Sequence, residues 1–347
     1  MAVFEHLDLL KEMHAERYIH INKHPDFPLW ICNYAKKTQH KGVWNAATTV
    51  CRGLILDENN RIVSRPFPKF FNYHETNPEE IPNEPFTVTD KVDGSLGISY
   101  FYKGVWRIAT RGSFTGNQAL KATEMLQRKY AYCLPKMNPD HTYLFEIIYP
   151  ENHIIVNYGE REELVLLAVI DTETGAELEN ISETGFPVLE KMEIRTLEEA
   201  LAMKKDNAEG LVLHYASGFR LKVKFEEYLR LHRVMMGINE INVWRYLSSG
   251  RKLDVLIETS PEEYRQWITD IGKKILVAYN EVLVKSTIEF QCLPQCRSKK
   301  EYAEHIKGNK YEGILFNFLN NKPVEQLCWQ YAKPEEEGEA WFSAGRG

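Results

Sequence analysis

The chain has 347 residues, of which 44% are hydrophobic, which is enough for one large domain and a smaller one with packed cores. Its net charge of -6 argues against a protein that coats nucleic acid nonspecifically, because that mode needs many lysine and arginine contacts to phosphates. No stretch has the roughly 18 apolar residues of a membrane span, and the six scattered cysteines fit reduced thiols, so we expect an intracellular, cytoplasmic protein with no membrane partner.

Strand-like runs separated by turns dominate the first two thirds of the chain. Val50–Leu56 and Arg61–Ser64 flank a polar turn and predict a hairpin, and Leu96–Tyr102 with Val105–Thr110 predict another. Asn117–Tyr130 has the pattern of a helix. These runs favour antiparallel sheets with flanking helices.

The same pattern continues to about residue 225. Leu164–Ile170 reads as a buried strand, and Thr196 with Glu199 matches a capping box that opens a short helix ending at Lys204. Gly210–Tyr215 and Phe219–Lys224 predict a further hairpin.

Helical spacing replaces strand alternation after Phe225. Ser260–Glu263 supplies an N-cap, a first-turn proline and an acidic third residue. Apolar residues then recur at helical spacing, at Tyr264, Trp267, Ile268, Ile271, Ile275, Ala278, Tyr279 and Val282. We predict an α+β domain over residues 1–240 and a helical C-terminal domain over 241–347, with Glu335–Glu339 as a solvated acidic end.

A lysine in a turn between two apolar strands is the first candidate for chemistry. Lys91 ends the run Phe86–Lys91 and is followed by Asp93, Gly94 and a second strand. We expect Gly94 to supply a turn conformation closed to other residues and Asp93 to bond the local backbone. An ordinary Asp-Gly hairpin turn with an exposed lysine is the competing interpretation.

Two glutamates and two lysines complete the candidate set. Glu146 lies in an apolar strand, where burial without a partner would be costly, and Glu209 begins another apolar strand. Lys222 and Lys224 alternate with apolar residues and therefore lie on one face, where both could contact one polyphosphate. A structural salt bridge at Glu146 and an amphipathic edge strand at the lysines are the alternatives.

Covalent nucleotidyl transfer needs such a set: a nucleophile, cations for a triphosphate, and carboxylates for a divalent metal or a ribose. Lys91 would attack the α-phosphorus of a nucleotide. Because a free lysine is protonated at pH 7, we expect its pKa to be lowered by Lys222, Lys224, Arg52 or a metal.

In their order along the chain, these residues resemble motifs I, III, IV and V of the covalent nucleotidyltransferase superfamily, and within it the phage-type RNA ligase 1 family. Lys91 matches the adenylated lysine. The segments more particular to that family are Cys51–Ile55, Pro68–Asn72, Thr110–Ser113 and Tyr149–Tyr158. Arg111 stands where the family has a lysine, and His153 where it has arginine.

The resemblance implies an ATP-dependent RNA ligase with a nucleotidyltransferase fold, active with Mg²⁺ or with Mn²⁺ in its place. Lys91 would take AMP from ATP, pass it to an RNA 5'-phosphate, and a 3'-hydroxyl would then displace AMP. It further implies the following roles. Arg52 and Lys69 would contact phosphates, Arg111, Asp93 and Gly94 would belong to the nucleotide site, Glu146 and Glu209 would serve ribose or metal, and Lys222 and Lys224 would hold the α-phosphate.

Two other classes of function are compatible with parts of this pattern. A DNA ligase or capping guanylyltransferase normally has an oligonucleotide-binding barrel after motif V, whereas the sequence there is helical. A noncatalytic RNA-binding or nucleotide-binding module would not need the nucleophile Lys91. The sequence indicates no obligate protein partner.

Overall fold

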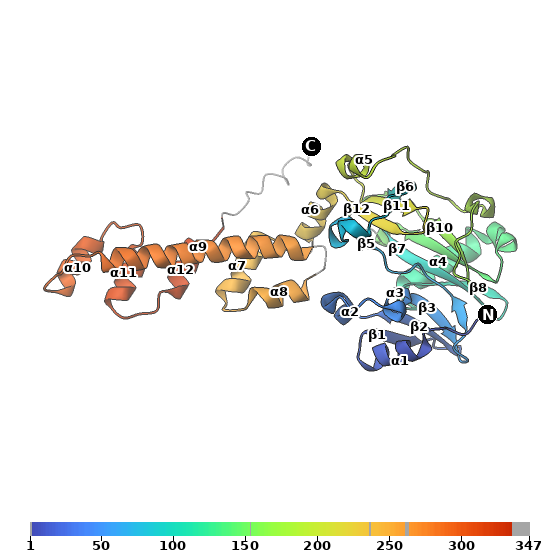
Figure 1. Ribbon diagram of the computed structural model, residues 1–347, viewed down its shortest axis with the longest axis horizontal. Coiled ribbons are helices and arrows are strands. Elements are labelled where there is room, and N and C mark those ends of the chain that lie inside the picture. Colours follow the sequence, from blue (N-terminus) through green and yellow to red (C-terminus); the bar gives the residue numbers. More distant parts are fainter. Residues whose placement is uncertain (1, 153, 236, 261–263, 335–347) are drawn as a thin grey trace. The chain divides into compact units, whose positions relative to one another are not determined.

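The computed structural model describes residues 2–152, 154–235, 237–260 and 264–334. The chain divides into two compact units, Met1–His232 and Arg233–Gly347, the first built on sheets and the second on helices (Figure 1). Among the described residues, no helix is both long and apolar enough to cross a membrane. The predicted α+β class, with antiparallel sheets followed by helices, is confirmed.

The first sheet is an antiparallel meander in chain order. Its strands are β1 (Ile19–Lys23), β2 (Leu29–Tyr34), β3 (Arg52–Asp57) and β4 (Ile62–Ser64). The predicted hairpin at this point is β3–β4, with a register shift between Ile55 and Leu56. Val50 does not join the strand as predicted, because it ends helix α3 (Ala46–Val50), which Asn45 opens with a capping box.

The second sheet has the strand order β10-β9-β7-β8. It consists of β7 (Ser95–Tyr102), β8 (Val105–Ala109), β9 (His141–Ile148) and β10 (Glu163–Asp171), and all of its pairings are antiparallel. The predicted hairpin β7–β8 and the buried strand β10 are confirmed. Residues alternate along β9, so that Phe145 and Ile147 enter the core beneath helix α4 (Asn117–Arg128) while Glu146 points to the other face.

The third sheet has the order β5-β12-β11-β6. Its members are β5 (Phe71–Asn72), β6 (Phe86–Lys91), β11 (Gly210–Tyr215) and β12 (Arg220–Lys224). The predicted hairpin β11–β12 is confirmed, and β5 pairs with β12 in parallel. Because β6 lies in this sheet and β7 in the second, the turn after Lys91 crosses between two sheets and is not a hairpin turn.

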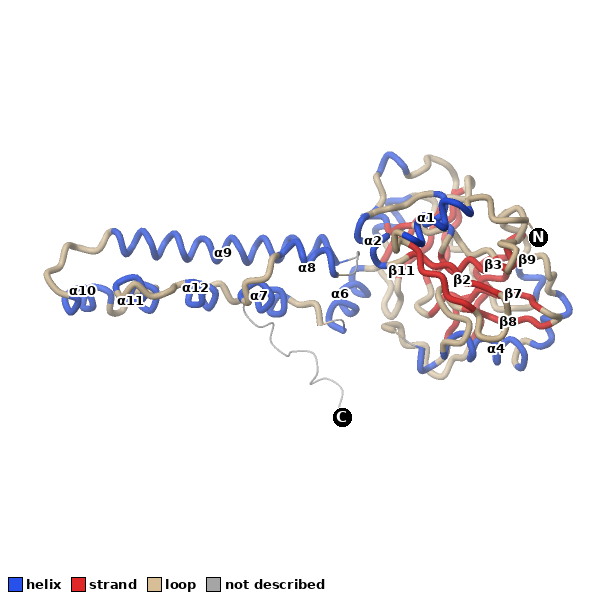
Figure 2. The backbone as a smooth tube through the Cα atoms, turned by 90° about the horizontal axis from the view of Figure 1, so that it is seen from below, coloured by secondary structure: helices blue, strands red, loops and turns tan. Residues whose placement is uncertain are grey.

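Helices cover the sheets of this unit (Figures 1 and 2). They are α1 (Leu7–Ala15), α2 (Lys36–Lys41), α3, α4 (Asn117–Arg128) and α5 (Leu197–Ala202), with short 3-10 turns at Tyr73–Glu75, Pro78–Glu80, Ala131–Lys136, Pro150–Asn152 and Ile181–Thr184. The predicted helix at Asn117 is α4, which buries Ala122, Met125 and Leu126 against the second sheet. The predicted capping box of α5 is present, with Thr196 and Glu199 bonded reciprocally.

The second unit is helical. Helix α6 (Glu226–Met235) begins in the first unit and ends in the second. The helices that follow it are α7 (Glu240–Ser248), α8 (Leu253–Thr259), α9 (Arg265–Gln291), α10 (Lys299–Ile306), α11 (Glu312–Leu319) and α12 (Glu325–Tyr331). The 27-residue α9 runs the length of this unit, and shorter helices pack along it (Figure 2). Pro261–Glu263 of the predicted helix start, and the acidic segment Glu335–Glu339, lie outside the described residues.

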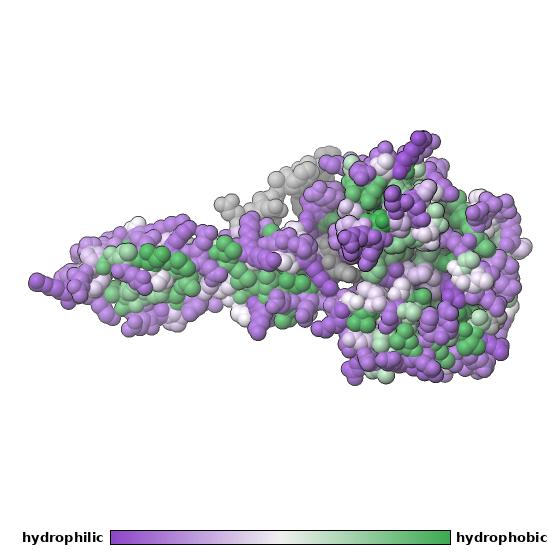
Figure 3. All heavy atoms as spheres, viewed as in Figure 1, coloured by the Kyte–Doolittle hydropathy of each residue, from purple (hydrophilic) through white to green (hydrophobic). Residues whose placement is uncertain are grey.

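Part of α9 keeps apolar side chains at the surface. Val277, Val284 and Ile288 are each more than half exposed, and hydrophobic surface is visible on this unit in Figure 3. The opposite side of α9 packs Tyr279, Val282 and Leu283 against the core formed by α11 and α12. The helix is therefore amphipathic only in part.

Candidate active site

Three neighbouring strands bring two lysines and a glutamate together. In the third sheet, Gly210 of β11 is paired on one side with Lys91 of β6 and on the other with Lys224 of β12. Glu209 immediately precedes Gly210, so its carboxylate lies between both ammonium groups. Lys91 Nζ is 2.5 Å from Glu209 Oε2, and Lys224 Nζ is 3.3 Å from Oε1.

Only glycine fits at position 210. A Cβ atom there would lie 2.1 Å from the carbonyl oxygen of Val223, far inside van der Waals contact. The close approach of β11 and β12 at this point is what sets Glu209 between the two lysines.

The pKa of Lys91 is raised, contrary to the expectation that neighbouring cations lower it. Burial lowers the pKa of Lys91, but the negative charges of Glu209 and Glu146 and the hydrogen bond to Glu209 outweigh it. The prediction was wrong because the sequence did not show that Glu209 reaches Lys91 more closely than any cation does. In this arrangement Lys91 is held as an ammonium by its carboxylate partner.

Glu146 reaches the same site from the second sheet. Its Oε1 accepts a hydrogen bond from the Gly94 backbone N–H at 3.0 Å. Burial and the charge of Glu209 raise the pKa of Glu146, the charges of Lys91 and Arg52 lower it, and the net result is a pKa of about 7. Two carboxylates from different sheets thus face one lysine, and one of them changes charge near neutral pH.

Three cations that form no ion pair with a described carboxylate, Lys222, Lys69 and Arg52, lie beside Lys91 and its two glutamates. Burial lowers the pKa of Lys222 well below its usual value, and the charges of Arg52, Lys69, Lys91 and Lys224 lower it further. Among the described residues, no carboxylate forms an ion pair within 4 Å with any of Lys222, Lys69 and Arg52. Such an excess of buried positive charge suits a polyanion.

Aromatic rings hold these cations in place. Lys222 Nζ lies 4.5 Å from the centre of the Phe70 ring, and Lys69 Nζ lies 4.2 Å from that of Phe71. Arg52, the first residue of β3, also lies over Phe70, and its buried Nη1 has no hydrogen-bond acceptor among the described residues. A buried guanidinium nitrogen without an acceptor is costly, so this atom marks a place where an anion would be stabilised.

Arg111 belongs to the same group. It follows β8, and its Nη1 donates to the Tyr34 hydroxyl at 2.9 Å, with the guanidinium 5.1 Å from the Tyr34 ring centre. Its charge lowers the pKa of buried Arg52, as a close neighbour would. The structure therefore brings all ten predicted site residues into one region of the first unit.

The Lys91 turn is built differently from the expectation. Gly94 has no positive φ, and it is required for space, because a Cβ there would lie 2.6 Å from the carbonyl oxygen of Ile147 in β9. The Asp93 carboxylate does not bond the local backbone but accepts from the backbone N–H groups of Ile155 and Val156. Both expectations came from hairpin turn chemistry, which does not apply where the chain passes between sheets.

The site offers oxygen ligands for a divalent cation. Mg²⁺ is usually held by one or two carboxylates together with substrate phosphates, and Glu146 and Glu209 supply such a pair. Among the described residues, no three His, Cys, Asp or Glu side chains gather as a complete ligand set. The donor chemistry thus fits a cation that binds with the phosphates of a nucleotide.

Several residues around the site were missed by sequence reasoning. The Tyr158 hydroxyl accepts a hydrogen bond from the Asp93 backbone N–H, and the Tyr228 hydroxyl donates one to the Asp93 carboxylate. The Tyr34 hydroxyl accepts from Arg111, and the centre of a Trp44 ring lies 5.4 Å from Lys69 Nζ. Only Tyr158 had a signal, since it ends the segment Tyr149–Tyr158. His153, in the same segment, lies outside the described residues.

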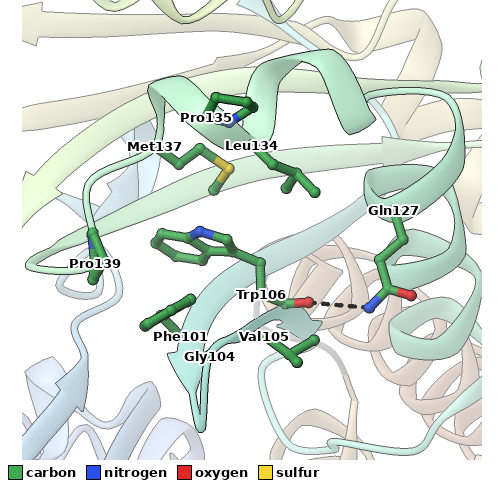
Figure 4. Close-up of a pocket in the computed structure, with 9 residues that line it drawn as sticks. All are labelled: Phe101, Gly104, Val105, Trp106, Gln127, Leu134, Pro135, Met137 and Pro139. Atoms are coloured by element: carbon green, nitrogen blue, oxygen red, sulfur yellow. Dashed lines mark hydrogen bonds between the residues drawn. The ribbon is translucent and has the colours of Figure 1, made fainter.

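An apolar pocket opens at the end of β7 that is farther from Lys91 (Figure 4). Figure 4 shows the Trp106 ring at its centre, and the Gln127 side chain donates to the Trp106 carbonyl oxygen at 3.3 Å. The lining consists of Phe101, Gly104, Val105, Trp106, Gln127, Leu134, Pro135, Met137 and Pro139. None of these side chains titrates near neutral pH, so the pocket offers no group for acid–base or nucleophilic chemistry.

Comparison with known proteins points to one family. A family model described as RNA ligase matches residues 50–229, just over half of the chain. The match begins beside Arg52 and ends just after Lys224, so it contains all ten of the predicted site residues.

Individual relatives agree with this match. A proposed bifunctional polynucleotide kinase/RNA ligase of Autographa californica nuclear polyhedrosis virus is 29% identical over 62% of this chain and 35% of its own length. A proposed RNA ligase of Thermovibrio ammonificans is 28% identical over 80% of this chain and 79% of its own. The RNA ligase of Rhodothermus phage RM378 is 28% identical over 36% of this chain and 38% of its own. The chain spans little more than a third of the first and third of these relatives.

Proposed function

Because the chain belongs to the RNA ligase family, we propose that it is an ATP-dependent RNA ligase that joins 5'-phosphate and 3'-hydroxyl ends. The observation that carries this proposal is a lysine held between two carboxylates, beside cations that form no ion pair with a carboxylate among the described residues. That arrangement suits attack by an amine on a nucleoside triphosphate. We further propose that this reaction serves RNA repair, in the cytoplasm, where ATP and RNA are both available.

The first step is transfer of AMP to Lys91. The Nζ atom forms a bond to the α-phosphorus, the bond from that phosphorus to the bridging oxygen breaks, and pyrophosphate leaves. The Lys91 ammonium must first give up a proton before Nζ can attack, and Glu209 Oε2, 2.5 Å away, can accept it. A second proton leaves Nζ as the phosphoramidate forms and can go to the departing pyrophosphate. Lys222, Lys69, Arg52 and their neighbours would bind the phosphates and the departing pyrophosphate.

Transfer to RNA uses the same site twice more. An oxygen of the RNA 5'-phosphate displaces Lys91 from the adenylate, and a 3'-hydroxyl then attacks that 5'-phosphate and releases AMP. In this last step Lys91 forms and breaks no bond. Mg²⁺, or Mn²⁺ in its place, held by Glu146 and Glu209, would supply positive charge for the phosphates.

The two parts of the chain would divide these tasks. We propose that residues 1–240 form the adenylyltransferase domain, since every predicted site residue lies there. Residues 241–347 would form the helical domain, with RNA-substrate binding as its role. Exposed Arg245, Arg251 and Lys252 on or beside α7 and α8 would contact phosphates in that case.

The test is incubation with Mg²⁺ and ATP labelled at either the α or the γ phosphate, followed by denaturing gel and intact mass. The matched variants are Lys91→Ala and Lys285→Ala, the second an exposed lysine on α9. Label from the α position on wild type and Lys285→Ala, and none on Lys91→Ala, is expected. No covalent label with ATP would contradict the mechanism, and label with GTP alone would favour a capping guanylyltransferase.

A parallel assay with nicked or single-stranded RNA and DNA separates an RNA ligase from a DNA ligase. A protein that binds RNA but forms no adenylate would instead be a noncatalytic module.

A further inference from the structure

The carboxylate of Asp93 is buried, and both of its oxygens accept hydrogen bonds from other parts of the first unit. Its side chain is 2% exposed. One oxygen accepts from the backbone N–H groups of Ile155 at 2.8 Å and Val156 at 2.9 Å. The other accepts from the Tyr228 hydroxyl of α6 at 2.9 Å. All three donors are more than sixty residues away in sequence, so they fix Asp93 relative to distant parts of the fold.

The backbone of the same turn is held in a similar way. The N–H of Asp93 donates to the Tyr158 hydroxyl at 2.9 Å, and the N–H of Gly94 donates to Glu146. The turn that follows Lys91 is thus fixed by side chains from other elements and not by its own turn hydrogen bonds. Removing one of those hydroxyls would release the turn without removing any group that contacts a nucleotide.

Residues 155–158, which make these hydrogen bonds to Asp93, are also hydrogen-bonded to Asn207, just before β11. Asn157 donates its backbone N–H to the Asn207 side chain at 2.8 Å, and the Asn207 amide donates back to the Asn157 carbonyl oxygen at 2.9 Å. Asn207 is two residues before Glu209, the ion-pair partner of Lys91. Residues 155–158 therefore bridge the nucleophile's turn and the strand that carries its carboxylate.

We propose that Tyr228 and Tyr158 are positioning residues that hold Lys91 in line with the α-phosphorus through Asp93. This inference rests on the proposed ligase function and deepens it, since it separates residues that orient the nucleophile from residues that bind phosphate. Neither hydroxyl needs to contact the substrate for this role. Both tyrosines lie in the first unit, and both bond the same aspartate.

Such a role has a signature that general loss of structure does not have. Lys91 forms or breaks bonds when AMP is taken from ATP and when it is passed to RNA. Joining of RNA that already carries a 5'-adenylate forms a phosphodiester and releases AMP without any bond to Lys91. A positioning defect at Lys91 should therefore slow adenylate formation and leave the joining of pre-adenylated RNA intact.

The experiment compares wild type with Tyr228→Phe and Tyr158→Phe, and uses Tyr143→Phe as the matched control. The Tyr143 hydroxyl accepts a backbone N–H from Asn138 at 2.8 Å, away from the Lys91 turn. Two rates are measured: single-turnover formation of the enzyme adenylate at saturating ATP, and joining of synthetic pre-adenylated RNA. Thermal unfolding of each variant is recorded alongside.

We expect Tyr228→Phe to slow adenylate formation about tenfold or more, as loss of one hydrogen bond to a charged group would do. Joining of pre-adenylated RNA should stay at the wild-type rate, and Tyr143→Phe should change neither rate. Adding Tyr228→Phe to Asp93→Ala should cost little more, because Asp93→Ala already removes the acceptor of the Tyr228 hydroxyl.

Two results would overturn the inference. One is a Tyr228→Phe variant that forms the adenylate at the wild-type rate. The other is an equal fall in both rates together with lower thermal stability, which is the pattern of a structural residue. If wild type itself forms no adenylate, the proposed function fails, and that outcome is distinguishable from failure of the positioning role.

Discussion

Replacing Glu146 with glutamine should stabilise the protein above neutral pH while preventing adenylate formation. Burial raises the pKa of Glu146 from 4.5 to about 7. Between these values the folded state holds a proton that the unfolded state has released, so the wild type loses stability as pH rises through this window. This difference between the two pKa values corresponds to at most about 3 kcal/mol of unfolding free energy. It is an upper limit because Glu146 is only half-buried, so that solvent screens part of the effect.

The assay is urea unfolding of wild type and Glu146→Gln, followed by circular dichroism, between about pH 4 and pH 8.5. Glutamine imitates the protonated acid, so the two proteins should have similar stability at the acid end. The variant should gain relative to the wild type as pH rises from 4.5 to about 7, and the difference should then stay constant. A stability difference that does not vary with pH, or that changes only outside this window, would refute the reasoning.

Glu75→Gln provides a control of opposite sign. Burial raises the pKa of Glu75, but hydrogen bonds from Asn72, including its backbone N–H at 2.9 Å, outweigh burial and lower it. Stability from this carboxylate is present above its unfolded pKa and is lost as pH falls through its folded pKa. Glu75→Gln should therefore destabilise the protein at neutral pH and make little difference at strongly acid pH.

Three further outcomes follow from single contacts. Gly94→Ala should cost about 1–3 kcal/mol and most of the activity, because its Cβ would lie 2.6 Å from the Ile147 carbonyl oxygen; urea unfolding and adenylate formation check this. ATP binding at mildly alkaline pH should take up a proton, because an anion raises the lowered pKa of Lys222; calorimetry in buffers of different ionisation enthalpy should show this uptake, and Lys222→Met should abolish it. Thr196→Ala should destabilise α5 by about 1 kcal/mol through loss of its N-cap, seen by urea unfolding, with adenylate formation unchanged.

Local patterns were sufficient to predict much of the fold. Three predicted hairpins and the capping box at Thr196 are present, because each depends on residues close together in the sequence. Strand alternation also predicted that Lys222 and Lys224 share a face, and both take part in the cation group beside Lys91. These features need no knowledge of which sheets pack together.

The errors concern contacts between distant segments. The bonding of Asp93 depends on residues 155, 156 and 228, and the raised pKa of Lys91 depends on Glu209, 118 residues later. Neither leaves a periodic signal, since the first follows from contact of the Lys91 turn with residues 155–156 and α6, and the second from the pairing of β6 with β11. A turn that joins two sheets has the same short sequence as a hairpin turn, so Asp93 and Gly94 could not reveal which one they form.

The crossing of the chain between sheets at Lys91 has a consequence for folding in the cell. Glu146 comes from the second sheet, whereas Glu209, Lys222 and Lys224 come from the third. A nascent or partly unfolded chain with only the third sheet formed would bring Lys91 to Glu209, Lys222 and Lys224 but would lack Glu146, and one with only the second sheet formed would lack the lysines. Consumption of ATP would then begin only in molecules whose two sheets have docked, so adenylate formation would report the completion of folding.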